Sequence, residues 1–237
     1  MTPAIDIIQK IADHAAADYP RECCGVIVVT KGKQRYFACR NISDQPTNFV
    51  IDPADYAAAE DTGEVLMIVH SHPDMAAVPS QADLVGMEKS GMPWLIMNWP
   101  TGAFGVFTPS GYVAPLVGRE FVHGVLDCYS LIRDYYQQAL GISLKDYPRQ
   151  YEWWLKGDDL YRQLFGDAGF VAVDAGQLQA HDVIFMRIAS PVDNHGAVYL
   201  GDDVVLQHVT GRLSSRDVYG GWWRKITTGV VRHKDLL

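Results

Sequence analysis

Two histidines, a serine and an aspartate stand close together in the first half of the chain. His70 and His72 end an apolar run, Pro73 follows them, and Ser80 and Asp83 come shortly afterwards. Histidines two residues apart on a strand project to the same side, and an aspartate one helical turn after a serine N-cap can face them. Catalytic zinc (Zn²⁺) takes three nitrogen or oxygen ligands and leaves a fourth position to water. The spacing therefore predicts a zinc site with His70, His72 and Asp83 as its ligands.

Two further residues could complete the chemistry of such a site. A metal-bound water needs a proton acceptor, and Glu22, just before the first predicted strand, is a carboxylate that can approach from a neighbouring element. Ser80 could donate a hydrogen bond to the oxyanion that develops on the attacked carbonyl. Both residues have an ordinary alternative, because a glutamate near a strand usually lies at the surface and Ser-x-x-Asp is commonly a helix cap.

A cysteine nucleophile is the second candidate. Cys128 begins a predicted helix directly after Asp127, where backbone N–H groups and the helix dipole favour a thiolate. His195 opens one predicted strand and His208 ends the next, and the turn at 201–203 brings both histidines to the same end of a hairpin. One can act as the base and the other can hold it by a hydrogen bond. Without such partners, a cysteine is usually an inert apolar residue.

Hydrophobic periodicity and turn residues indicate the elements that position these groups. In the first half they predict a helix from residue 5 to 15, a hairpin of strands 26–29 and 34–39, a helix after 52–53, a strand at 65–69, a helix at 80–89 with Gly91 as its cap, and strands at 94–98 and 103–107. In the second half they predict a helix from Asp127 that Gly141 ends, and strands at 182–188, 196–200 and 204–209.

The stretch from residue 108 to 118 contains two prolines and two glycines and no charge, which predicts a linker. The chain of 237 residues therefore divides into two expected domains, 1–112 and 119–237. Each half mixes helix and strand signals. We expect two domains that both mix α-helices and β-strands.

Composition excludes several classes of protein. With 48% hydrophobic and 20% charged residues, the chain is typical of globular proteins, and a net charge of -8 with a pI of about 5.4 argues against a nucleic-acid partner. No run reaches the roughly 18–20 apolar residues that a membrane span needs. The start has neither the basic nor the apolar part of a signal peptide, and four cysteines form no disulfide framework. We expect synthesis in a cytoplasm.

The string H-x-H-P-x6-S-x-x-D, with Glu22 upstream, resembles the JAMM (Mov34/MPN) metallopeptidases across roughly residues 1–110. The resemblance implies a cytidine-deaminase-like α/β fold and a zinc hydrolase that cuts amide or isopeptide bonds. It assigns His70, His72 and Asp83 as ligands and Glu22 as the general base.

The second half resembles the NlpC/P60 cysteine peptidases over about residues 119–237. The features are Asp-Cys at a helix start, the strand near 182, His-Gly-x-x-Tyr-Leu-Gly and a final histidine. The resemblance implies a papain-like α+β fold in which Cys128, His195 and His208 hydrolyse bacterial peptidoglycan stem peptides, typically between D-γ-glutamyl and diaminopimelyl residues. Two positions depart from the family: Tyr129 replaces a small residue, and Ala180-His181 replaces Pro-Gly.

The two domains in this order resemble a family of tail tip proteins from lambda-like phages. That resemblance implies a bifunctional peptidase made in the host cytoplasm, carried in the virion tail tip and active at the host cell wall, with other tail tip proteins and peptidoglycan as partners. Three alternatives remain open: a deubiquitinase-like enzyme, a host cell-wall remodelling enzyme, which would need an export signal, and a non-enzymatic tail tip plug. The basic residues near the C-terminus are interpreted as a solvated end rather than a docking surface.

Overall fold

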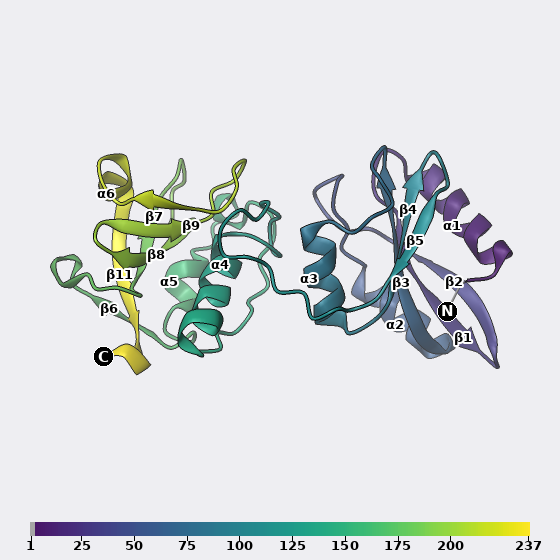
Figure 1. Ribbon diagram of the computed structural model, residues 1–237, viewed down its shortest axis with the longest axis horizontal. Helices are drawn as coiled ribbons and strands as arrows, with labels where there is room; N and C mark the ends of the chain where they lie inside the picture. The colour runs from purple at the N-terminus through teal and green to yellow at the C-terminus, as the bar shows by residue number, and fades with distance from the viewer. Residues whose placement is uncertain (1–2) are drawn as a thin grey trace. The chain divides into compact units, whose positions relative to one another are not determined.

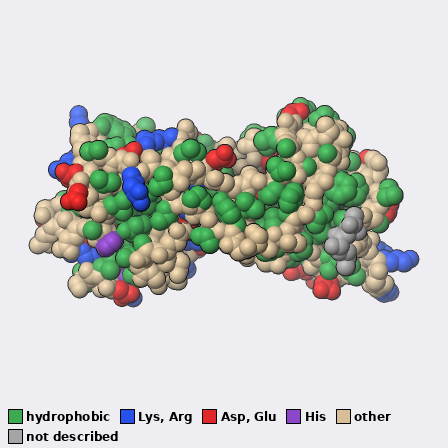
Figure 2. Space-filling model, viewed as in Figure 1, with side chains coloured by type: hydrophobic (Ala, Val, Ile, Leu, Met, Phe, Trp, Pro, Cys, Tyr) green, Lys and Arg blue, Asp and Glu red, His purple; other side chains and the backbone are tan. Residues whose placement is uncertain are grey.

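The protein consists of two compact units. The computed structural model describes residues 3–237, and the division between the units lies between Val113 and Ala114, inside the stretch 108–118. Each unit has its own sheet and its own helices (Figure 1). On the face seen in Figure 2, the Lys and Arg side chains of each unit are scattered rather than gathered in one patch.

The first unit is built on a five-stranded sheet. Its elements are α1 (Ile5–Asp18), β1 (Cys24–Thr30), β2 (Lys33–Cys39), α2 (Pro53–Thr62), β3 (Glu64–Pro73), α3 (Gln81–Ser90), β4 (Trp94–Trp99) and β5 (Phe104–Phe107). The strand order is β2-β1-β3-β4-β5, and only the β3–β4 pair is parallel. Every element expected in this half is present.

Helices cover both faces of this sheet because its strands alternate between two apolar clusters. Ile7 and Ile11 of α1 pack on one face with Val69 of β3. On the other face, Ala59 of α2 and Met87 of α3 pack against β1 and β3. The central strand β3 is therefore buried on both sides, as a strand between two helical layers must be.

Strand β3 is longer than the sequence indicates and includes both candidate ligands. The expected strand stops at Val69, whereas β3 continues to Pro73. The reason is pairing: His70 lies opposite Cys24 of β1 and Ile96 of β4, and His72 lies opposite Asn98. Neighbouring strands supply the backbone partners that two polar residues in mid-sheet need.

The second unit is a six-stranded sheet with helices packed against it. Its elements are α4 (Cys128–Tyr135), a π turn (Tyr136–Leu140), α5 (Leu160–Leu164), β6 (Phe170–Val173), β7 (Val183–Met186), β8 (His195–Gly201), β9 (Val204–Gln207), β10 (Ser215–Val218), α6 (Trp222–Ile226) and β11 (Thr227–His233), with 3-10 turns at Trp153–Leu155, Ala175–Gln177 and Lys234–Leu236. The strand order is β10-β9-β8-β7-β11-β6. The main core lies between α4 and the strands.

Buried arginines fix the loops of this unit. Arg232 forms an ion pair with Asp182 at 2.7 Å, and the fully buried Arg119 reaches Asp134 at 2.6 Å. Such pairs require well-placed partners because both charges have left water. Among residues 3–237, all the cysteines are free and no helix has the length and apolarity for a membrane crossing.

Candidate metal and thiol sites

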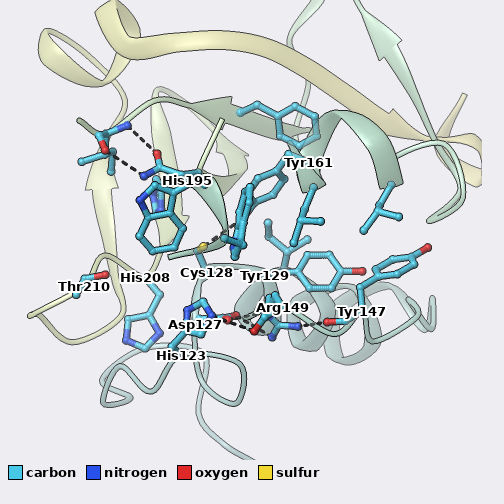
Figure 3. Close-up of a pocket in the computed structure, with 18 of the residues that line it drawn as sticks. His123, Asp127, Cys128, Tyr129, Tyr147, Arg149, Tyr161, His195, His208 and Thr210 are labelled. Atoms are coloured by element: carbon cyan, nitrogen blue, oxygen red, sulfur yellow. Dashed lines mark hydrogen bonds and ion pairs between the residues drawn. The ribbon is translucent and has the colours of Figure 1, made fainter. Parts of the chain in front are cut away.

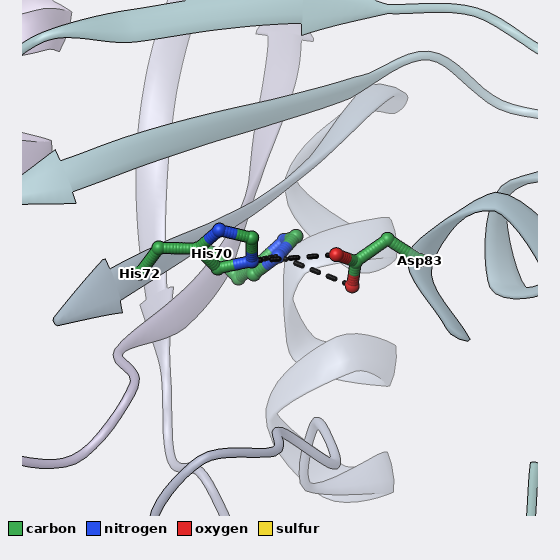
Figure 4. A group of neighbouring side chains, drawn as sticks. All are labelled: His70, His72 and Asp83. Carbon is green, nitrogen blue, oxygen red and sulfur yellow. Dashed lines mark hydrogen bonds and ion pairs between the residues drawn. The ribbon is translucent and has the colours of Figure 1, made fainter. Parts of the chain in front are cut away.

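His70, His72 and Asp83 converge in the first unit (Figure 4). The Nε2 atom of His70 lies 3.3 Å from Oδ1 of Asp83, and Nε2 of His72 lies 3.3 Å from Oδ2. The two Nε2 atoms are 3.1 Å apart. One ligand atom from each residue lies within 4.8 Å of the others, and all three residues are buried.

The donor set fits zinc. Two imidazole nitrogens and a carboxylate oxygen are a known ligand set for catalytic zinc. The Nδ1–H of His72 donates to the Ala76 carbonyl at 2.9 Å, which leaves its Nε2 lone pair for a metal. Phe49 stacks on the His70 ring with centroids 4.5 Å apart and holds its plane.

The Ser80 hydroxyl is hydrogen-bonded to Asp83. Its hydroxyl accepts from the Asp83 backbone N–H at 3.1 Å and donates to Asp83 Oδ2 at 2.7 Å. The Ser80 backbone N–H donates to the same Oδ2 at 2.7 Å and completes a capping box at the start of α3. We expected this hydroxyl to stabilise an oxyanion. The structure shows it in the capping arrangement that was the alternative, with its proton on Asp83, and the oxyanion role stays a prediction.

Glu22 is buried beside this cluster rather than exposed. Its exposed fraction is 3%. Burial raises the pKa of the Glu22 carboxyl to about 8, with opposing influences from His72 and Asp83, whose charges are near enough to act on it. A buried carboxyl with a pKa near neutrality, close enough to the ligands for their charges to act on it, has the property of a general base.

Cys128 occupies the first turn of α4. Asp127 is the N-cap of that helix and accepts from the backbone N–H of Ser130 at 2.9 Å. Arg149 binds both oxygens of Asp127, at 2.6 and 3.0 Å. Burial alone would raise the pKa of Asp127, but Arg149 outweighs it and holds that pKa at about 2. The cap therefore stays charged and fixes the helix start.

The thiol itself differs from the expected thiolate. Burial is the largest influence and raises the pKa of the Cys128 thiol, and the charge of Asp127 raises it further. Two hydrogen bonds to Sγ lower the thiol pKa but do not offset this increase. They come from the Tyr161 hydroxyl, 3.2 Å away, and from the backbone N–H of Gly196. With its pKa raised by burial, the resting side chain is a thiol that needs a base to ionise.

The hydrogen-bond partner of the His195 ring is Gln207 rather than His208. Its Nε2 lies 2.9 Å from Gln207 Oε1, while the Gln207 amide donates to Asp217 at 2.5 Å. Because the amide NH₂ is used on Asp217, the oxygen accepts from His195 and leaves Nδ1 to take a proton. Burial lowers the pKa of His195 to about 4, so the ring is neutral near pH 7.

The expected orienting residue, His208, has a different environment. Within residues 3–237, neither of its buried ring nitrogens has a hydrogen-bond partner. Its ring packs against Phe121 with centroids 5.1 Å apart. Burial also lowers the pKa of His208 to about 4. The ring lines the same pocket as Cys128 and His195 but does not hold His195.

This pocket has a volume of about 470 Å³ and is largely aromatic. Figure 3 shows Cys128 between Tyr161 and Arg149, with His195 and His208 to one side. Two residues of this pocket to which the sequence assigned no role contact the thiol or its helix cap: Tyr161 contacts Cys128 and Arg149 binds Asp127. Gln207 contacts His195. The alternation of side chains along paired strands could have indicated Gln207. Gln207 lies opposite Ala197, which is two residues after His195, so Gln207 and His195 share one face of the sheet.

Two family models match the chain. Residues 5–108 match prokaryotic homologs of the JAB domain, and residues 118–232 match the NlpC/P60 family. The expected fold classes are confirmed: a JAB/MPN-like α/β domain followed by an NlpC/P60 α+β domain.

Relatives of known name match most of the chain. The tail tip assembly protein K of Escherichia phage N15 is 42% identical over 232 residues, which cover 97% of this chain and 95% of that protein. The tail tip assembly protein K of Escherichia phage lambda is 36% identical over 184 residues, or 78% of this chain and 89% of that protein. A CysO-cysteine peptidase of Mycobacterium tuberculosis is 32% identical over 87 residues, or 33% of this chain and 60% of that protein.

Proposed function

The chain belongs to the family of tail tip assembly protein K, and from this premise we propose that it acts in phage tail tip assembly as a peptidase with two separate centres. One is a zinc-dependent peptidase or isopeptidase in the first domain, and the other is a cysteine endopeptidase in the second. The observation that carries the proposal is that each domain gathers a full set of reacting groups: His70, His72 and Asp83 meet in one, and Cys128 and His195 line one pocket in the other.

The second domain hydrolyses peptide bonds of peptidoglycan stems, of the D-γ-glutamyl-diaminopimelate type. Nδ1 of His195 takes the proton of the Cys128 thiol as the sulfur attacks the carbonyl carbon. The same nitrogen returns the proton to the leaving amine, and water then hydrolyses the thioester. Gln207 keeps His195 in the required tautomer throughout.

The first domain cuts an amide or isopeptide bond in a protein partner. Zinc, when bound, supplies a Lewis acid that polarises a carbonyl and lowers the pKa of water. His70, His72 and Asp83 hold it, and Glu22 accepts the proton from the attacking water and passes it to the leaving amine. One relative of part of the chain is itself named as a peptidase, which supports this assignment.

The setting follows from the family. Assembly takes place in the host cytoplasm together with other tail tip proteins, and the cysteine centre acts on the cell wall when the virion arrives. The phage relatives favour this setting over a host wall-remodelling enzyme.

A zymogram on purified peptidoglycan, combined with metal analysis, tests both centres. Wild type clears murein and binds about one zinc per chain. Cys128→Ala stops clearing and keeps its zinc, whereas His72→Ala loses zinc and keeps clearing. Equal clearing by Cys128→Ala would refute the cysteine centre, and zinc unaffected by His72→Ala would refute the metal site. Inactivity of wild type in both assays would leave a structural plug as the function.

A further inference from the structure

The pocket beside Cys128 contains a carboxylate that the proposed chemistry does not use. Glu152 is partly buried and lines this pocket. Across the described part of the chain, its side chain has neither a hydrogen bond nor an ion pair. An unpaired carboxylate on the wall of a pocket is available to a ligand of opposite charge.

The positive charge on the pocket wall is already balanced. Arg149 is the one Lys or Arg among the described residues that line the pocket, and it forms ion pairs with Asp127 at 2.6 Å and with Asp146 at 3.1 Å. The charge of Glu152 is therefore left without a counter-charge on this wall. An unbalanced negative charge attracts a cation and repels a carboxylate.

Three aromatic rings form a corner next to this carboxylate in the chain. The centroid of the His123 ring lies 5.6 Å from that of Tyr151 and 6.2 Å from that of Trp154, and the last two are 6.3 Å apart. The Nε2–H of His123 donates to the Arg149 carbonyl at 3.1 Å, which fixes this ring. All three rings line the pocket. Aromatic faces beside a carboxylate are the combination that binds an alkylammonium group.

Another part of the pocket lining also has polar atoms without partners. The ring of His208 lines the pocket, and neither of its nitrogens is hydrogen-bonded to any residue that the structure describes. Buried polar atoms in native proteins nearly all have partners. A neutral imidazole has one N–H donor and one acceptor, as a peptide group has. The pocket therefore fits a peptide that brings polar groups and a positive charge.

The proposed stem substrate has a group of that charge next to the bond that breaks. Its D-γ-glutamyl residue contributes a carboxylate, whereas its diaminopimelyl residue has an amino group at the far end of the side chain. That amino group is a charged ammonium near pH 7 when it is free. In a cross-linked stem it is acylated and has become an uncharged amide.

We propose that Glu152 binds the free side-chain ammonium of the diaminopimelyl residue, against the rings of Tyr151 and Trp154, and that the second domain thereby favours stems without a cross-link. The inference rests on the proposed cysteine peptidase and adds a specificity-determining residue to it. Acylation of the amine removes its positive charge, so a cross-linked stem would cover Glu152 and leave this carboxylate unpaired. Cys128 and His195 perform the same steps on either kind of stem.

Two tripeptides that differ in one group test the proposal. The first is L-alanyl-D-γ-glutamyl-diaminopimelate with a free side-chain amine, and the second is the same peptide with that amine acetylated. We expect the full wild-type chain to have a kcat/KM at least about tenfold higher for the free amine, near the lower end of the effect of a hydrogen bond to a charged group. Equal kcat/KM values for the two peptides overturn the proposal.

Variants separate charge from shape. Glu152→Gln keeps the size and removes the charge, so it should lower kcat/KM for the free amine and reduce the preference to about twofold or less. Trp154→Leu should reduce the preference about threefold, because it loses a cation–π contact. Asp158→Asn is the matched control, since Asp158 is exposed in the same segment and does not line the pocket. Circular dichroism confirms each fold. A preference that both folded pocket variants retain in full contradicts the proposal.

A third peptide distinguishes two sources of the ammonium. In this peptide the N-terminal alanine is acetylated and the side-chain amine is free, and we expect nearly the kcat/KM of the unmodified peptide. A loss that depends on Glu152 would assign this carboxylate to the N-terminus and overturn the diaminopimelyl assignment. Cys128-dependent cleavage of all three peptides at equal rates removes this inference alone, whereas wild type that cleaves none of them removes the proposed cysteine peptidase too.

Discussion

The Oε1 atom of Gln207 lies 2.9 Å from Nε2 of His195, and Asp217 holds the other end of the same amide. Arg212 in turn forms an ion pair with Asp217 at 2.8 Å, so the contacts run from His195 through Gln207 and Asp217 to Arg212. An imidazole that is fixed through one nitrogen presents the other as a base. Gln207, which no sequence motif marked, is therefore placed to orient His195, the role that we predicted for His208.

Replacement of Gln207 tests this role. We expect Gln207→Ala to lower kcat for murein fragments about a hundredfold, near the lower end of what a positioned proton acceptor contributes, with a smaller change in KM. His208→Ala is the matched variant and should lose much less, because its ring does not hold His195. Steady-state kinetics measures kcat and KM of both variants. A larger loss of kcat in His208→Ala than in Gln207→Ala would identify His208 as the orienting residue.

Tyr161 is expected to assist the thiol. Its hydroxyl lies 3.2 Å from Sγ and lowers the thiol pKa relative to burial alone. Tyr161→Phe should therefore raise that pKa further and shift the pH profile of iodoacetamide alkylation of Cys128 to higher pH. Tyr151→Phe, on another wall of the same pocket, should leave the profile in place. Coincident profiles for wild type and Tyr161→Phe would show that the hydroxyl does not act on the sulfur.

The metal site could be predicted because its parts are local. His70 and His72 share one strand, and Asp83 lies in the first turn of the next helix, so strand parity and a capping motif suffice to bring them together. The capping role of Ser80 could be predicted in the same way, because Ser80 and Asp83 have the spacing of a capping box.

The thiol site was harder to predict because it depends on pairing between distant segments. His208 and Gln207 are neighbours in sequence, and only the register of β8 and β9 shows that Gln207 shares the face of His195. Tyr161 and Arg149 come from a stretch, 141–169, with little regular structure, whose path is fixed by the Arg149–Asp127 pair. No periodicity marks such contacts.

Three strands escaped prediction for a related reason. β6, β10 and β11 are short or mixed in polarity, and β11 pairs with β6 and β7, which are far away along the chain.

His181 stands where the NlpC/P60 family commonly has glycine. Its φ of +78° is one that glycine adopts readily, which explains why the family favours glycine there.

Acidification should destabilise the second unit through its buried histidines. The folded-state pKa values of His195 and His208 are both about 4, below the ordinary value of about 6.5. Between these values the unfolded chain binds protons that the folded chain does not, so each histidine lowers the free energy of unfolding by up to about 1.4 kcal/mol per pH unit as pH falls. Urea denaturation at pH 7 and pH 5 measures the loss.

A variant isolates the contribution of one ring. His208→Gln cannot titrate, so its free energy of unfolding should fall less than that of wild type between pH 7 and pH 5. His14→Gln is the control, because that ring lies in the first unit beside Asp18. Equal losses for wild type and His208→Gln would mean that His208 is protonated in the folded state, contrary to its burial.

Ser80 separates two roles at the metal site. Ser80→Ala removes the hydroxyl that caps α3 and holds Asp83, so we expect a loss of about 1 kcal/mol in stability and a roughly 10- to 100-fold weaker zinc affinity, the usual cost of losing a ligand's hydrogen-bond partner. Ser80→Thr keeps a hydroxyl and should restore both. Chelator competition gives the affinity and thermal denaturation the stability. If Ser80→Ala instead kept full zinc affinity and stability while hydrolysis by the first domain collapsed, the hydroxyl would act on the oxyanion rather than on Asp83.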